Sequence, residues 1–150
     1  MEPLEKTAEG LSAVFFSAAK ELRHLDLEDP EGLWDALAAD AEAAGLLCQG
    51  STGQQALDEG FDPTDITWMS LSMLDLAKAD IEVGYARDAR LWCTLACIIA
   101  NEAEAIGILT ETTQGADKLI AEIVIISREL GRLFGMSPVG FPTDGLRRIA

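Results

Sequence analysis

The feature that most constrains the fold is a run of leucine and isoleucine residues near the C-terminus. Leu119, Ile123, Ile126, Leu130 and Leu133 follow one another at spacings of four, three, four and three residues. This alternation places all five side chains on one side of a helix and is typical of a coiled coil or a helical bundle. It predicts a long apolar helix over residues 115–134, with the five residues forming a seam that contacts other helices.

The seam has two interpretations. Ile120, Val124 and Ile125 widen the apolar surface, and few polar residues remain between positions 119 and 126. Isoleucine at such positions favours assemblies of more than two helices, so the sequence favours self-association through the seam and predicts a homo-oligomer. The alternative is a central helix of a monomeric bundle.

The rest of the chain also has helical periodicity. Apolar residues recur three and four positions apart between breaks marked by glycine, proline and capping residues. We therefore expect an all-α fold, a compact bundle of about five helices, with residues 1–135 as one domain and residues 136–150 as a C-terminal extension. The expected helices cover residues 4–25, 30–44, 64–83, 91–106 and 115–134, with a short helix at 54–59.

Charge is distributed unevenly along the chain. The formal net charge is −15, and residues 1–65 contribute −12, from 15 acidic residues against Lys6, Lys20 and Arg23. Residues 66–110 contribute −3, from six acidic and three basic residues, and residues 111–150 contribute zero, from five of each. An acidic N-terminal half indicates a protein partner of its own and would repel nucleic acid. Alternatively, these residues form a solvated surface that needs no partner.

Membrane and export signals are absent from the sequence pattern. No apolar run approaches the roughly 20 residues needed to cross a bilayer. The N-terminal residues M-E-P-L-E-K lack the basic and apolar segments of a signal peptide. We therefore expect a cytoplasmic protein, in the host cytoplasm if it is viral, with no membrane partner.

The cysteines are expected to be small core residues. Cys93 and Cys97 lie four residues apart in the apolar run L-W-C-T-L-A-C-I-I-A, facing the same side of the expected helix, and Cys48 follows another helix. A metal site would need further ligands, and His24 is the sole histidine. No metal and no cofactor are expected.

Candidates for catalysis are few. His24 lies near the end of the first expected helix, where a structural role suits it. Glu102 is a candidate base or magnesium ligand, although no second inward carboxylate accompanies it. The Glu-x-x-His motif of di-iron bundles does not occur, and Gly50 and Gly53 lack the lysine of a phosphate loop. The sequence favours a non-enzymatic protein, and an enzyme that uses Glu102 is the minority alternative.

Four arginines are candidates for contact with the DNA backbone: Arg128, Arg132, Arg147 and Arg148. Arg128 and Arg132 share one side of the C-terminal helix. Such side chains contact phosphate and position a protein on DNA without reading its sequence. The alternative is that they pair with neighbouring acidic residues such as Glu122 or Glu129.

Two segments of the chain echo each other. Residues 38–57 and 100–119 agree at 8 of 20 positions when offset by 62, and several of the matches are alanine. Both segments read as a helix, a glycine stop, a polar turn and a second helix. A duplicated helical hairpin and independent use of the same capping residues both account for this pattern.

Three further segments share a pattern of helix ends. They are L-W-D-A-L-A-A-D-A-E-A-A-G-L-L at 33–47, E-A-E-A-I-G-I-L-T-E-T-T-Q-G at 102–115 and E-L-G-R-L-F-G-M-S-P at 129–138, with two arginines after the last. Together they resemble the small subunits of phage terminases.

The resemblance implies a non-enzymatic viral DNA-packaging protein. Such subunits assemble into rings, recognise viral DNA and pass it to the large motor subunit. It implies that the seam is the contact between subunits, that the four arginines touch the DNA backbone, and that the acidic half faces away from DNA or toward the motor. The competing hypothesis is an acidic helical interaction or inhibitor protein, of the nucleic-acid-mimic type, that binds another protein.

Overall fold

Helices account for nearly all of the regular structure. A computed structural model describes residues 2–25 and 31–139, and within these ranges it has no β-strand, only an isolated bridge between Thr7 and Thr52. The prediction of an all-α bundle is therefore confirmed. In chain order the elements are η1 (Pro3–Glu5), α1 (Glu9–Arg23), α2 (Leu33–Cys48), α3 (Gly53–Asp58), α4 (Pro63–Glu82), α5 (Ala86–Ala105) and α6 (Ala116–Phe134).

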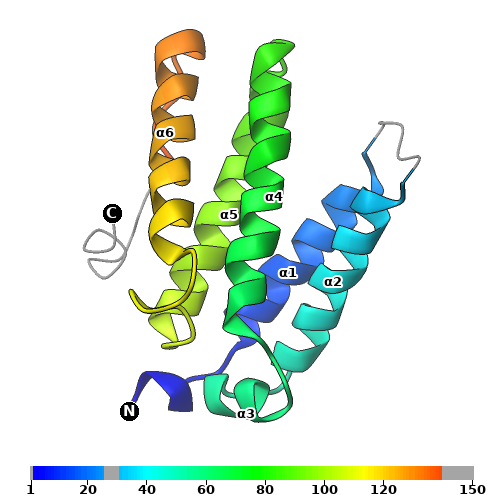
Figure 1. The fold of residues 1–150 in the computed structure, drawn as a ribbon, viewed down its shortest axis with the longest axis vertical. Coiled ribbons are helices and arrows are strands. Elements are labelled where there is room, and N and C mark those ends of the chain that lie inside the picture. The colour runs from blue at the N-terminus through cyan, green and yellow to red at the C-terminus, as the bar shows by residue number, and fades with distance from the viewer. Residues whose placement is uncertain (1, 26–30, 140–150) are drawn as a thin grey trace.

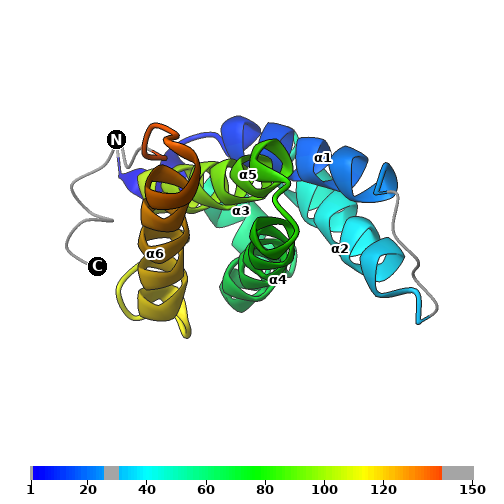
Figure 2. The ribbon, with the colours of Figure 1, turned by 90° about the horizontal axis from the view of Figure 1, so that it is seen from above.

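Two helical hairpins make up most of the molecule, and α6 packs beside the second of them. The first hairpin is α1 with α2, the second is α4 with α5, and α6 lies against both α4 and α5 (Figure 1). Seen from above, α1 and α5 lie on one side and α2 and α4 on the other, and α6 extends beside both α4 and α5 (Figure 2). The hairpins meet where α1 contacts α5, whereas α2 and α4 make only sparse contacts in the described part of the chain.

Small residues bring α1 and α2 close together. Gly45 lies under the ring of Phe16, and a Cβ atom at position 45 would be 3.0 Å from that ring. The hydroxyl of Ser12 donates a hydrogen bond of 2.9 Å to the carbonyl of Gly45. Gly45 therefore sits inside α2, which continues to Cys48, and the prediction that the helix ends at this glycine is wrong.

The second hairpin and α6 share a core of large apolar side chains. Ile66, Met69 and Met73 of α4 and Ile99 of α5 are almost completely buried. An Asp62 carboxylate oxygen accepts a hydrogen bond of 3.0 Å from the backbone N–H of Thr64 and so caps the start of α4. Burial of this apolar surface is the main stabilising contribution to the bundle.

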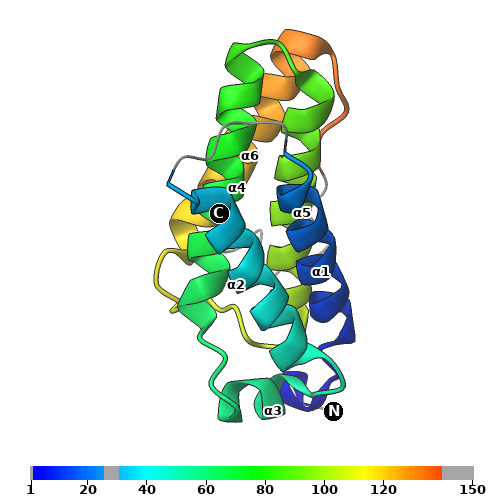
Figure 3. The ribbon, with the colours of Figure 1, turned by 90° about the vertical axis from the view of Figure 1, so that its right-hand side faces the viewer.

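The base of the molecule joins the two hairpins. Ala8 N donates to the carbonyl of Ser51 at 2.8 Å, and Gly53 N donates to the carbonyl of Lys6 at 3.0 Å, so η1 and the start of α3 lie together. Gly107, with a φ of 77°, lies beside Pro3, where a Cβ atom would be 3.0 Å from the proline ring. Figure 3 shows α1 and α2 covering only the part of α4 and α5 nearest this base.

Two helix starts differ from the sequence prediction. The first long helix begins at Glu9 because Pro3–Glu5 forms a separate 3-10 turn and Lys6 is extended. α5 begins at Ala86, earlier than the expected residue 91, since the chain turns already at Gly84, where φ is 83°. Gly135 ends α6 in the left-handed conformation, with a φ of 67°.

α6 is amphipathic, and the expectation of a long apolar C-terminal helix is not supported. Leu119, Ile123 and Leu130 are buried on one side, whereas Lys118 and Arg128 are exposed on the other. No helix in residues 2–25 and 31–139 is long and apolar enough to cross a membrane. After α6, Val139 N donates a hydrogen bond of 2.8 Å to the hydroxyl of Ser127.

Candidate functional site

A groove between α2 and α4 combines aromatic and charged side chains. It consists of two adjoining hollows, of about 260 Å³ and about 230 Å³, which share Trp68. We refer to them together as the α2–α4 groove. The first hollow is lined by Asp40, Ala43, Ala44, Leu47, Phe61, Asp62, Asp65, Trp68 and Met69, and the second by Leu33, Trp34, Ala36, Leu37, Trp68, Ser72 and Asp75.

Helical spacing explains why these residues line one groove. On α4, Asp65, Trp68, Ser72 and Asp75 are three or four residues apart, so they lie on one side of the helix. The opposite side of α4 packs against α5 and α6. α2 likewise uses Ala38 and its neighbours against α1, which leaves its other side facing the groove.

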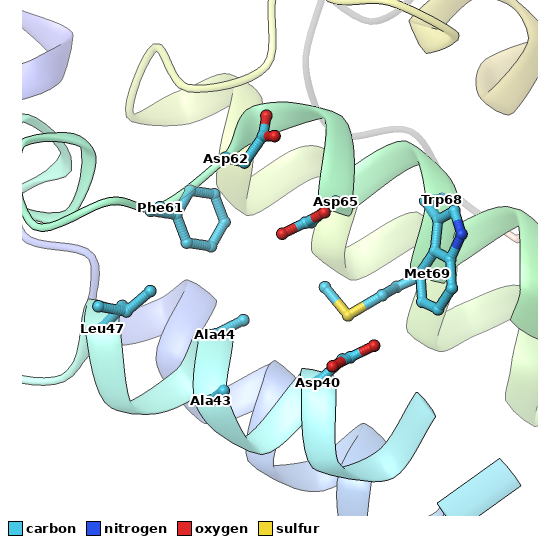
Figure 4. Close-up of a pocket in the computed structure, with 9 residues that line it drawn as sticks. All are labelled: Asp40, Ala43, Ala44, Leu47, Phe61, Asp62, Asp65, Trp68 and Met69. Carbon is cyan, nitrogen blue, oxygen red and sulfur yellow. The ribbon is translucent and has the colours of Figure 1, made fainter. Parts of the chain in front are cut away.

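Three carboxylates lie around the first hollow. Figure 4 shows Asp40 on α2 and Asp65 on α4 on opposite sides of the hollow, with Met69 between them in this view and Asp62 at the start of α4. Burial raises the pKa of the Asp65 carboxyl, and the negative charges of Asp62 and Asp40 raise it further. The backbone N–H of Thr64 lowers the pKa of Asp62, and the Thr64 hydroxyl lowers it further. The hollow therefore concentrates negative charge, and none of the described residues that line it is basic.

Trp68 is the central aromatic residue of the groove. Half of its surface, 51%, is exposed, and it contributes to both hollows. Its side chain therefore faces the groove and not the buried core of the bundle. Leu33, at the second hollow, is also exposed at 57%. Exposed aromatic and aliphatic groups next to carboxylates can contact both the apolar and the cationic parts of a ligand.

The sequence around the groove contains no basic residue. Between His24 and Lys78 there is no lysine, arginine or histidine, whereas the same stretch contains 12 aspartate and glutamate residues. All of α2, α3 and the groove-lining part of α4 fall in this stretch. Charges counted over residues 25–77 instead of residues 1–65 reveal this absence of basic residues from the sequence alone.

Four of the five seam residues are buried inside the chain's own bundle. Leu119, Ile123 and Leu130 are 0% exposed and Ile126 is 2% exposed, whereas Leu133 is 46% exposed. α6 packs these residues against α4 and α5. In this fold the seam is an intrachain contact, because the required partner helices are supplied by the same chain. Self-association stays a prediction, and of the five seam residues Leu133 alone is exposed enough to take part in it.

Two of the four candidate DNA-contacting arginines, Arg128 and Arg132, lie in the described residues, and both are on α6. Arg132 is paired with Glu129, at 2.8 Å between guanidinium and carboxylate, which confirms the alternative of local pairing for this residue. Arg128 is exposed on α6. Arg147 and Arg148 lie outside the described residues.

The candidate catalytic residues are far apart in the chain and lie in different settings. His24 is exposed at the end of α1 and lines a separate hollow of about 320 Å³ with Glu21, Asp80 and Tyr85. Glu102 is half-buried on α5 and lies over Gly10, where a Cβ atom would be 2.3 Å from its Oε2. In residues 2–25 and 31–139, no group of three or more histidine, cysteine and acidic residues has a metal-binding arrangement.

The three cysteines are all buried, as the sequence predicts. Burial raises the pKa of Cys93 to about 12 and those of Cys48 and Cys97 to about 11. Cys97 accepts a hydrogen bond of 3.4 Å from the side-chain amide of Asn101. These thiols are therefore protonated at neutral pH, which makes them weak nucleophiles.

Comparison of the chain with protein-family models, with curated proteins and with solved structures finds no match.

Proposed function

We propose that this protein is a non-enzymatic, acidic interaction protein that binds a positively charged partner protein through the surface formed by α2, α3 and the start of α4. The observation that carries this proposal is the stretch between His24 and Lys78, which has 12 acidic residues and no basic one. A surface of one sign attracts ligands of the opposite sign and accelerates their association.

The arrangement of the acidic residues supports binding more than simple solvation. Asp40, Asp62 and Asp65 come from two different helices and lie around one hollow. The pKa of Asp65 is raised in part by the other two, so these charges repel each other in the free protein. A bound cation would relieve that repulsion, whereas dispersed solubilising charges would not be crowded in this way.

A titration with simple charged peptides tests the proposal. A fluorescein-labelled peptide of alternating lysine and glycine is expected to bind at low salt, as measured by fluorescence anisotropy, and to dissociate as salt screens the charges. The double substitution Asp40→Asn and Asp65→Asn should weaken binding about fivefold, given the modest energy of exposed ion pairs. The matched control, Glu111→Gln with Asp117→Asn, removes two exposed carboxylates near the start of α6 and should change little.

Two results would contradict the proposal. One is equal binding of a peptide of alternating glutamate and glycine. The other is no binding of the lysine peptide even at low salt.

A role in viral DNA packaging is a second candidate. It is supported by the resemblance of residues 33–47, 102–115 and 129–138 to phage terminase small subunits and by the exposed Arg128. Light scattering coupled to size exclusion, followed by a gel shift with duplex DNA at low salt, tests it. A monomer that shifts no DNA would rule this candidate out and leave the first proposal intact.

A further inference from the structure

We propose that the α2–α4 groove binds an amphipathic helix of another protein, with apolar side chains on one face of that helix and lysine or arginine residues along its edges. This inference rests on the proposed function and adds the shape of the ligand and the residue at the centre of its site.

The length and direction of the groove suit a helix. Its lining residues run from Leu33 to Leu47 along α2 and from Asp65 to Asp75 along α4, with Phe61 and Asp62 just before the start of α4. α2 has 16 residues, which corresponds to about 24 Å. A ligand helix of about 15 residues has the same length. The helices on both sides make only sparse contacts with each other, and Figure 1 shows α2 running away from α4 toward its N-terminal end.

The groove offers apolar side chains to one face of such a helix. Leu33 and Trp68 expose more than half of their surfaces. Trp34 and Leu47 are partly buried and pack on the core from the groove side. A ligand helix that places apolar residues every three or four positions can cover this surface, which is the mode of many helix-in-groove complexes.

The carboxylates select the charge of the ligand. Asp40, Asp62 and Asp65 lie around one hollow, and Asp75 lies at the other, so acidic groups accompany the apolar surface along its length. Lysine or arginine at the edges of the ligand helix would face these groups. Trp68, between Asp65 and Asp75 along α4, can also contact a cation through its ring. The groove therefore fits a basic amphipathic helix better than a neutral one.

The same charges disfavour other occupants. A second copy of this chain carries a formal net charge of −15, and its α2, α3 and early α4 have no basic residue to offer. Nucleic acid and anionic lipid surfaces are repelled for the same reason. A basic helix of a different protein is the occupant that charge complementarity favours.

Two synthetic peptides of the same composition provide the test. The first places leucine at helical spacing with lysine and arginine along the edges, and the second is a scrambled sequence without amphipathic spacing. Isothermal titration calorimetry on the full chain is expected to show at least about tenfold tighter binding of the first peptide, and circular dichroism should show that it becomes helical on binding.

Matched variants locate the site. Trp68→Ala should weaken the amphipathic peptide about tenfold, because a central aromatic residue commonly dominates such an interface. Tyr85→Ala, which removes an aromatic residue of similar exposure (61%) outside the groove, should leave the affinity unchanged. If Trp68→Ala unfolds, Asp40→Asn with Asp65→Asn serves instead and should weaken the peptide while circular dichroism stays that of the wild type.

The outcomes separate this inference from the function on which it rests. If the two peptides bind with equal affinity, or if neither groove variant changes the affinity, the inference of a helix-binding groove is wrong. The lysine–glycine titration can still support an acidic interaction protein in that case. Failure of every cationic peptide to bind overturns both. Concentration-dependent dimerisation that Trp68→Ala abolishes would show that a second copy occupies the groove and would overturn the inference.

Discussion

Ile123→Ala is the substitution that best tests the position of α6 in the bundle. Ile123 is completely buried, whereas Ile125, two residues further along the same helix, is 52% exposed. The sequence favours a seam between chains for Ile123, with the core of a monomeric bundle as the alternative, and the structure places it in the core of one chain. Ile125→Ala is the matched control, because both changes replace isoleucine by alanine in α6 and bring the same gain in helix propensity.

The expected magnitude follows from burial. Replacing isoleucine by alanine removes three carbon atoms, and at about 0.8 kcal/mol for each buried carbon the lost transfer free energy is about 2.4 kcal/mol. The cavity left in a close-packed core raises the total destabilisation to about 3–4 kcal/mol. Ile125→Ala should change the free energy of unfolding by about 0.5 kcal/mol or less, because its side chain is already half in water.

Urea unfolding followed by circular dichroism measures both effects. With a slope of about 2 kcal/mol per molar urea, Ile123→Ala should lower the midpoint by about 1.5–2 M, and Ile125→Ala should hardly move it. The measurement is repeated over a wide range of protein concentration. An intrachain core predicts midpoints that are independent of concentration.

Two observations would refute this reasoning. Equal midpoints for the two variants would mean that Ile123 is not in a core. A deficit of Ile123→Ala that appears only at high protein concentration would mean that its side chain contacts another copy, as the spacing of the seam first indicated.

Three further predictions concern single features of the fold. Gly115→Ala should lower the free energy of unfolding by about 1–3 kcal/mol in urea titrations, because Gly115 has a φ of 83° and a Cβ atom there would be 3.2 Å from Oγ1 of Thr67. The control Gly50→Ala should lower it less, because Gly50 has a φ of 70° but open space around it. Equal destabilisation by the two substitutions would show that the contact with Thr67 is unimportant. Asp62→Ala should lower the unfolding midpoint at neutral pH. Because the pKa of Asp62 is lowered in the folded protein, the loss of stability should be full above the ordinary carboxyl pKa and shrink as pH falls through the lowered value. A loss of stability that does not depend on pH would contradict the charged cap. A thiol reagent at mildly alkaline pH should label none of the three cysteines in the native protein and all three in urea, because burial raises every thiol pKa to about 11 or 12. Rapid labelling of the native protein would contradict this prediction and show that the helices open locally.

The helices could be predicted from the sequence because each depends on nearby residues. The apolar spacing in α4 and α6 and the left-handed glycine at Gly135 are local signals, and both are observed in the structure. Gly45 was misleading because the same residue type serves as a helix end and as a point of close helix contact. Only the position of the Phe16 ring, which lies on another helix, distinguishes the two uses.

The groove could not be predicted in the same way. Trp68 and Met69 are adjacent in an apolar pattern, yet Met69 is buried at 2% exposure and Trp68 is half exposed. The difference in exposure depends on how far α2 diverges from α4, and the packing of the whole bundle determines that divergence. The spacing of the seam likewise specifies that Ile123 needs helical neighbours, but it does not say whether those neighbours belong to the same chain.

The close approach of the Glu102 side chain to Gly10 determines how substitutions at position 10 would affect the fold. These two residues lie where α1 of the first hairpin contacts α5 of the second, and neither lines the α2–α4 groove. A larger residue at position 10 displaces the carboxylate end of the Glu102 side chain. Where that side chain cannot move away, the two helices separate and the angle between the hairpins changes. Substitutions between α1 and α5 are therefore expected to alter the peptide binding proposed for the α2–α4 groove, without changing any residue that lines it.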